Sequence, residues 1–355
     1  MAALESVRVL ELASVLAGPL AATALAERGA HVTKVERPPL GDVTRSWKGA
    51  NEDAASETSA YYEAANGSKH LHWMDLASEE GQLWLEEQLT SHDVLIENFK
   101  AADLAKFNLQ PEAVAARHPH LVRVRLIGFT DAPERLAYDV VVQAETGFMH
   151  LNGESDGPPL RMPVALMDVL ASHQIRLAAL EGLLSRSHGK TGFFAEVSLA
   201  GSGVTALVNQ GTNWLVAGNS PHRNGGVHPN IAPYGDVLLC KNGHLVLAIG
   251  NNRQFEGLCQ VLAQPTLLQD ERFSSNQRRV MHRKALMDSL NLASSEWEKA
   301  PLELALRQAG APAGVVRTLE EVFEPDGPHA EWIQTNASGA NRPAAIAYRV
   351  HHFGH

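Results

Sequence analysis

Short runs of apolar, often β-branched residues alternate with helical patterns over the first half of the chain, and this alternation constrains the fold most strongly. Residues 19–28 have an apolar face that predicts a helix, and Gly29 is placed to end it in a left-handed turn. The alternation is typical of a parallel sheet covered by helices on both faces, so the sequence predicts an α/β, Rossmann-like fold. The expected strands are residues 7–12, 31–36, 70–75, 93–97, 121–127 and 193–198.

The composition changes near residue 218, which indicates a division into domains. Before this point, residues 38–67 are expected to form a long surface loop that touches ligand. Helices are expected over residues 168–185 and 199–217, the second of them largely buried. We predict a large domain over residues 1–217, a linker over 218–233, a small α+β domain over 234–329, and a second linker over 330–355.

The expected small domain opens with a hairpin signal. Asn242-Gly243 separates two strand-like runs, residues 236–240 and 245–250. Helical patterns follow at residues 253–262, 279–292 and 301–310. A last strand is expected at residues 344–350, within the second linker.

The 355-residue chain carries 40 acidic and 30 basic side chains, which gives a formal net charge of −10. This charge disfavours nonspecific attraction to nucleic acid or to an anionic membrane, and no run of about 18 apolar residues predicts a membrane span. Only Cys240 and Cys259 occur, without the spacing of a metal site or of a disulfide framework. We therefore expect a soluble cytoplasmic protein with no metal site.

Residues 12–18 follow the first expected strand, where a dinucleotide-binding fold would carry its Gly-x-Gly-x-x-Gly signature. Only Gly18 is present, so an ordinary NAD enzyme is not expected. The segment is either a simple tight turn into a helix, or a turn whose backbone amides face an anionic or thioester group. Four basic residues near strand ends are each either a solvated surface charge or a phosphate ligand. These residues are Arg37, Arg45, Lys69 and Lys106.

Asp168 is an isolated carboxylate in an otherwise apolar run, residues 163–170. Because it opens an expected helix, one interpretation is an N-cap whose carboxylate accepts backbone N–H groups. The other is a carboxylate nucleophile in a site that excludes water, able to form a covalent acyl intermediate. The two roles can coexist.

Several ordered motifs resemble the class III CoA-transferases, the CaiB/BaiF family, along nearly the whole chain. They include Leu16-Ala17-Gly18-Pro19, Gly41-Asp42-Val43-Thr44-Arg45, Glu97-Asn98-Phe99, Tyr138-Asp139-Val140-Val141, and His228-Pro229-Asn230. The resemblance implies a Rossmann-like large domain, a small domain joined by two linkers, and an interlocked homodimer. It also implies that CoA moves between carboxylic acids, with acyl-CoA and a carboxylic acid acceptor as substrates and no tightly bound cofactor.

The same resemblance assigns roles to individual residues. Asp168 would be the nucleophile, forming first an aspartyl-acyl anhydride and then an aspartyl-CoA thioester. The residues expected to contact CoA are Leu16, Ala17, Arg37, Met74, Asn98, Phe99, Lys106, Tyr138 and Asp139.

Two alternatives stay open at this stage. One is an epimerase like the α-methylacyl-CoA racemases, in which deprotonation at Cα replaces nucleophilic attack and a His stands at the position of Tyr138. The other is a noncatalytic CoA-binding protein, favoured by Ala77 at a position where the family has a phosphate-binding Lys.

Overall fold

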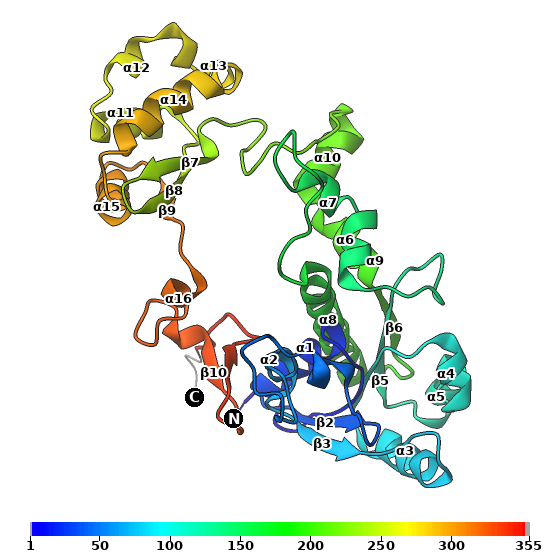
Figure 1. Ribbon diagram of the computed structural model, residues 1–355. Helices are drawn as coiled ribbons and strands as arrows, with labels where there is room; N and C mark the ends of the chain where they lie inside the picture. Colours follow the sequence, from blue (N-terminus) through cyan, green and yellow to red (C-terminus); the bar gives the residue numbers. More distant parts are fainter. Residues whose placement is uncertain (1, 352–355) are drawn as a thin grey trace. The chain divides into compact units, whose positions relative to one another are not determined.

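A six-stranded parallel sheet forms the centre of the larger of two compact units in the computed structural model, which describes residues 2–351 (Figure 1). The strand order is β3-β2-β1-β4-β5-β6, so the direction in which the sheet is built reverses between β1 and β4. This confirms the α/β, Rossmann-like prediction, and ligands bind such sheets at the carboxyl ends beside the reversal. The strands are β1 Arg8–Leu12, β2 His31–Glu36, β3 His70–Trp73, β4 Val94–Glu97, β5 Val122–Ile127 and β6 Phe194–Ser198.

Helices cover both faces of this sheet because successive strand residues point in opposite directions. Val9 of β1 packs in a cluster with Ala21 of α1 and Ile175 of α8, whereas the next residue, Leu10, packs in a cluster with Leu85 of α3. The helices of this unit are α1 Ala17–Glu27, α2 Ala60–Asn66, α3 Glu79–Ser91, α4 Ala101–Lys106, α5 Pro111–Arg117, α6 Asp139–Glu145, α7 Phe148–Leu151, α8 Leu166–Ser187, α9 Leu199–Ala206 and α10 Val208–Ala217. A short 3-10 helix, η1, spans Val43–Ser46.

The end of α1 follows the prediction. Gly29 has φ +99°, the left-handed conformation in which glycine carries no steric penalty, and this conformation ends the helix. The chain then enters β2 at His31, so the first strand-helix-strand unit is confirmed.

Four expectations about secondary structure are wrong. Residues 38–67 are not one long loop, because they contain η1 and α2. The helix expected over residues 279–292 is divided at His282 between α13 Asn276–Met281 and α14 Arg283–Ser294. The helix expected over residues 199–217 is broken at Leu207 into α9 and α10, and α10 has no buried residue. Its apolar content suggested burial, yet Leu215 and Val216 are both more than four-fifths exposed. Residues 344–350 form no strand, because the backbone N–H groups of Ala345 and Ile346 donate to the Glu27 carboxylate rather than to a neighbouring strand.

The second compact unit contains residues 150–160 and 222–328. Its antiparallel sheet consists of β7 Tyr234–Cys240, β8 Gly243–Ala248 and β9 Ala313–Val315, and the hairpin expected at Asn242-Gly243 joins the first two. The helices around it are α11 Asn252–Val261, α12 Thr266–Gln269, η2 Glu271–Phe273, α13 Asn276–Met281, α14 Arg283–Ser294, α15 Lys299–Gln308 and α16 Leu319–Val322.

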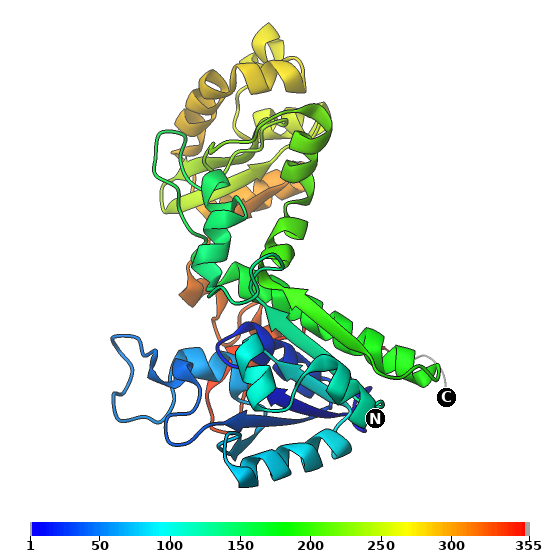
Figure 2. The same cartoon turned by 90° about the vertical axis from the view of Figure 1, so that its right-hand side faces the viewer.

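Residues 329–351 group with the larger unit, where η3 Ala330–Trp332 precedes a hairpin of β10 Ile333–Thr335 and β11 Asn341–Pro343. The domain boundaries expected from the sequence stay a prediction. No helix among residues 2–351 is long and apolar enough to cross a membrane. Figure 2 shows the same elements after a quarter turn.

Candidate active site

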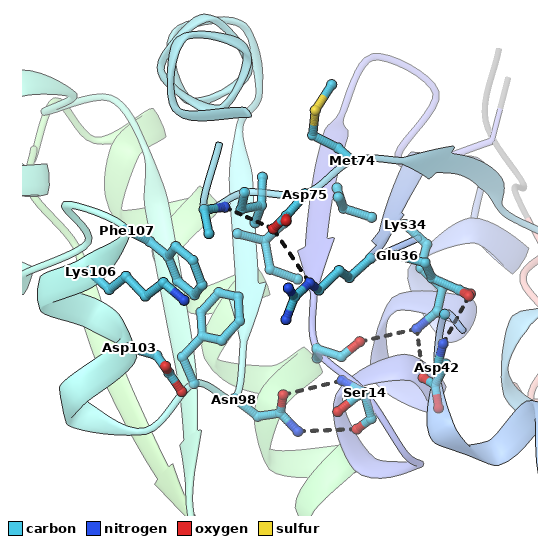
Figure 3. Close-up of a pocket in the computed structure, with 18 of the residues that line it drawn as sticks. Ser14, Lys34, Glu36, Asp42, Met74, Asp75, Asn98, Asp103, Lys106 and Phe107 are labelled. Carbon is cyan, nitrogen blue, oxygen red and sulfur yellow. Dashed lines mark hydrogen bonds and ion pairs between the residues drawn. The ribbon is translucent and has the colours of Figure 1, made fainter. Parts of the chain in front are cut away.

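The turn between β1 and α1 lies at the carboxyl end of the sheet, beside the reversal of strand order. Asn98, which follows β4, holds this turn through two hydrogen bonds with Ser14 (Figure 3). Its Oδ1 accepts the Ser14 N–H, and its Nδ2 donates to the Ser14 carbonyl, both at 3.1 Å. The next residue, Val15, has φ +74°, which is strained for a β-branched side chain. Gly18 is required at its position because an added Cβ would lie 2.5 Å from the Ala13 Cβ.

Asp168 lies in the first turn of α8 and is only 8% exposed. The helix begins at Leu166 and Ala165 is its N-cap residue, so the interpretation of Asp168 as an N-cap is wrong. Burial raises the pKa of the Asp168 carboxyl to about 7, and the nearby negative charge of Asp139 is the second cause of this rise. The backbone N–H of Ala17 faces this carboxylate and opposes the shift by favouring the charged form.

Asp139 stands at the start of α6 and accepts hydrogen bonds from the Met167 N–H at 2.7 Å and from the Gln143 side chain at 2.6 Å. It thereby satisfies an N–H group in the first turn of α8 while bringing a second negative charge near Asp168. Tyr61 also lies near these two carboxylates. Burial is the main cause, and the charges of Asp168 and Asp139 are further causes, of the rise in the pKa of its hydroxyl to about 12. Sequence reasoning missed Tyr61, which lies in the long segment expected to be a loop.

A cavity of about 340 Å³ lies at the carboxyl ends of β1 to β4 (Figure 3). The predicted CoA-contact residues Arg37, Met74, Asn98, Phe99 and Lys106 all line it. The Phe99 ring lies 4.9 Å from the Phe107 ring, which gives the cavity an aromatic wall. The other residues expected to contact CoA lie elsewhere, at the β1–α1 turn (Leu16 and Ala17) and at the start of α6 (Tyr138 and Asp139).

The basic residues near the strand ends divide into accessible and buried ones. The Arg37 side chain is 72% exposed, and its Nε lies 3.5 Å from the Asp75 carboxylate, so most of its guanidinium is accessible. Lys106 lies on the cavity wall, with its Nζ 5.4 Å from the centre of the Phe107 ring. Both are placed to meet an anion.

The phosphate-ligand interpretation is wrong for Lys69 and Arg45. Lys69 is buried, and its Nζ lies 2.6 Å from the Glu11 carboxylate. Arg45 donates to the Glu36 carboxylate and to the Tyr62 hydroxyl, each at 2.6 Å, so its guanidinium is already neutralised. The sequence signal for these pairs was the presence of acidic residues inside otherwise apolar strands.

Within residues 2–351, no group of three or more His, Cys, Asp or Glu side chains could hold a metal ion. Cys240 and Cys259 are free, buried thiols of the smaller unit. The polar groups that the structure does bring together at this site are the Asp168 and Asp139 carboxylates, the Ala17 amide and the charged side chains around the cavity.

Comparison with known proteins identifies the family. A family model described as CoA-transferase family III matches residues 4–350. The succinate–glutarate CoA-transferase of Agrobacterium fabrum is 36% identical over 326 residues, which cover 90% of this chain and 81% of that protein. The succinyl-CoA:glutarate CoA-transferase of Mus musculus is 33% identical, with 91% and 74% of the two chains covered.

A crystal structure points to the same family. The structure of a CaiB/BaiF family protein from Brucella suis superposes with a TM-score of 0.86 and 34% identity, covering 98% of this chain and 92% of that one. The chain thus belongs to CoA-transferase family III and is an enzyme of this class.

Proposed function

We propose that this enzyme moves CoA between two carboxylic acids through covalent intermediates on Asp168. One observation carries the proposal: a nearly buried carboxylate, Asp168, faces the backbone amide of Ala17 at the turn that also borders the cavity. Desolvation strengthens a carboxylate as a nucleophile, whereas the amide keeps part of the population ionised at neutral pH.

The first half of the proposed reaction transfers CoA from the donor to the enzyme. An Asp168 oxygen attacks the thioester carbonyl of the donor, the C–S bond breaks, and CoA thiolate leaves behind a mixed anhydride. The thiolate then attacks the Asp168 carbonyl of the anhydride. This step releases the donor acid as a carboxylate and leaves an aspartyl-CoA thioester.

The second half transfers CoA to the acceptor. The acceptor carboxylate attacks the aspartyl-CoA thioester, which expels CoA thiolate and forms a second anhydride. The thiolate attacks the acceptor carbonyl, so the new acyl-CoA leaves and the Asp168 carboxylate is regenerated. No proton, electron or metal is consumed in the cycle, in keeping with a site made of carboxylates and amides.

We propose that CoA occupies the cavity at the carboxyl ends of β1 to β4. Arg37 and Lys106 supply positive charge for its phosphates, and Met74 and Phe99 supply apolar contact. Asn98 holds the β1–α1 turn beside the cavity through its two hydrogen bonds with Ser14. Leu16 and Ala17 place backbone groups near the thioester, and Tyr138 and Asp139 border the nucleophile.

We propose small dicarboxylic acids as the substrates, because relatives that cover most of this chain carry the names succinate–glutarate and succinyl-CoA:glutarate CoA-transferase. We also propose an interlocked homodimer, supported by the exposed apolar side chains of α10, among them Trp214 and Leu215. The free thiols of Cys240 and Cys259 favour a reducing compartment such as the cytoplasm.

The decisive experiment is to trap the intermediate. The protein is incubated with succinyl-CoA and other acyl-CoAs, treated with hydroxylamine, and mapped by peptide mass spectrometry. A hydroxamate on Asp168 in the wild type, and none in Asp168→Asn, is the expected result. The matched control is Asp288→Asn, which changes an exposed carboxylate paired with Lys284 and should be modified like the wild type.

Two results would contradict the proposal. One is full CoA transfer by Asp168→Asn. The other is solvent deuterium entering the α-position of an acyl-CoA without exchange of CoA between acids, which would indicate the epimerase alternative.

A further inference from the structure

The left-handed backbone of Val15 is held by a buried carboxylate from another part of the chain. Valine rarely adopts a φ of +74°, because its branched side chain crowds the backbone there. The Val15 N–H donates to both carboxylate oxygens of Asp42, at 3.2 and 3.4 Å. Strain of this kind persists only where the surroundings determine the conformation.

Asp42 is itself fixed from several sides. One of its oxygens accepts the Thr44 N–H at 3.0 Å and the Thr44 hydroxyl at 2.7 Å, and the other pairs with Lys34 Nζ at 3.1 Å. The side chains of Asp42 and Lys34 are each only 1% exposed. An ion pair buried to this degree requires well-formed hydrogen bonds, because both charges have lost their water.

Lys34 connects the same carboxylate to the turn at a second point. Its Nζ donates to the Ala13 carbonyl at 3.0 Å and pairs with Glu11 of β1 at 2.9 Å. Asp42 and Lys34 therefore form hydrogen bonds with the backbone of the turn on both sides of Ser14, at Val15 and at Ala13. Two residues beyond Val15, the Ala17 N–H faces the Asp168 carboxylate.

We infer that Asp42 is a positioning residue for catalysis: it holds Val15 in its left-handed conformation and so aims the Ala17 amide at the nucleophile Asp168. The inference rests on the proposed function, because it assumes that Asp168 is the nucleophile. Asp42 acts through the backbone of the turn and not by contact with the reacting atoms. Small displacements of a group that orients a nucleophile have large effects on rate.

The test uses the full-length protein and transfer of CoA from succinyl-CoA to glutarate. Asp42→Asn keeps the shape of the side chain but removes the charge that pairs with Lys34. We expect kcat to fall by about 10- to 100-fold, whereas the KM for succinyl-CoA changes by less than about twofold. Asp93→Asn is the matched control. Asp93 also accepts a backbone N–H, from Arg8, and pairs with an arginine, but it precedes β4 and so lies at the amino ends of the strands, away from the site.

A second substitution separates this role from a merely structural one. Glycine adopts positive φ without strain, so Val15→Gly removes the need for Asp42 to hold the turn. In the Val15→Gly background, Asp42→Asn should lower kcat by no more than about threefold. If Asp42→Asn does not fold, Thr44→Val replaces it, because this change removes one hydrogen bond to Asp42 and should still lower kcat with KM unchanged.

Three results would overturn the inference. The first is wild-type kcat in the Asp42 variant, or in the Thr44 variant that replaces it. The second is a raised KM with unchanged kcat, which would make Asp42 a substrate contact. The third is an equal loss of kcat in the two backgrounds. Activity in Asp168→Asn would instead refute the proposed function, whereas an inactive Asp168→Asn with a fully active Asp42→Asn refutes the positioning role alone.

Discussion

Replacing Asp168 by Asn should stabilise the protein, and the gain should grow as the pH rises. Burial, together with the charge of Asp139, raises the pKa of the Asp168 carboxyl from 3.8 to about 7. Between these two values the folded protein binds more protons than the unfolded chain, so the stability of the wild type falls with increasing pH. Asparagine has a similar shape and does not ionise, so the variant escapes this loss.

The magnitude follows from the shift itself. One pKa unit corresponds to about 1.4 kcal/mol, so the raised pKa destabilises the wild type by about 4 kcal/mol at pH 8. Near pH 5, where the folded carboxyl is still protonated, the same shift costs only about 1.5 kcal/mol. The advantage of Asp168→Asn should therefore grow by about 2.5 kcal/mol between these pH values.

Urea unfolding of the wild type and the variant at both pH values measures this difference. Asp288→Asn is the control, since the Asp288 side chain is 65% exposed and its replacement should have the same small effect at both pH values. An Asp168→Asn advantage that does not change with pH would refute the argument, because it would mean that Asp168 ionises in the folded protein as it does in the unfolded chain. A gain of the predicted size would show that the fold carries this carboxylate at the expense of stability, as functional sites often do.

Three further predictions concern the nucleophile, the cavity and its supporting loop. Because only ionised Asp168 can attack a thioester, kcat should rise with pH through about 7. Asp139→Asn removes a neighbouring negative charge and should move this rise to lower pH. A pH–rate profile unchanged by the substitution would contradict this prediction. Asp75→Asn should release Arg37 and lower the KM for acyl-CoA about two- to fivefold, whereas Arg37→Ala should raise this KM about tenfold. The same KM in the wild type and both variants would mean that Arg37 does not bind CoA. Gly41→Ala should destabilise the protein by about 2 kcal/mol or more in urea unfolding, since Gly41 has φ +70° and the added Cβ would lie 2.2 Å from a carboxylate oxygen; wild-type stability would show that the loop can adjust.

The sequence predicted the sheet well because its signal is local. The run over residues 31–36 is β2 with the same bounds, and the other strands differ from their predicted ranges only at their ends. The cavity could be anticipated for a related reason, since residues that follow parallel strands meet at one edge of the sheet. This rule placed Arg37 at the cavity.

The buried ion pairs could not be predicted in the same way. Lys69 lies between α2 and β3, a position that suggested an accessible cation. Its partner Glu11 lies in β1, 58 residues earlier in the sequence, so the pair forms only when the sheet is assembled. The partnership of Asp42 with Val15 likewise depends on contact between segments 27 residues apart. The exposure of α10 was missed because apolar content does not tell which surface a helix presents.

The most direct test of the account follows the oxygen atoms. In the proposed cycle, the second anhydride leaves one oxygen of the acceptor acid on Asp168 when CoA thiolate attacks the acceptor carbonyl. After turnover of succinyl-CoA with glutarate whose carboxylate oxygens carry a heavy isotope, peptide mass spectrometry should find the label on Asp168 and on no other carboxylate. Turnover that leaves Asp168 unlabelled would contradict the account, because CoA would then pass between the acids without an anhydride at this residue.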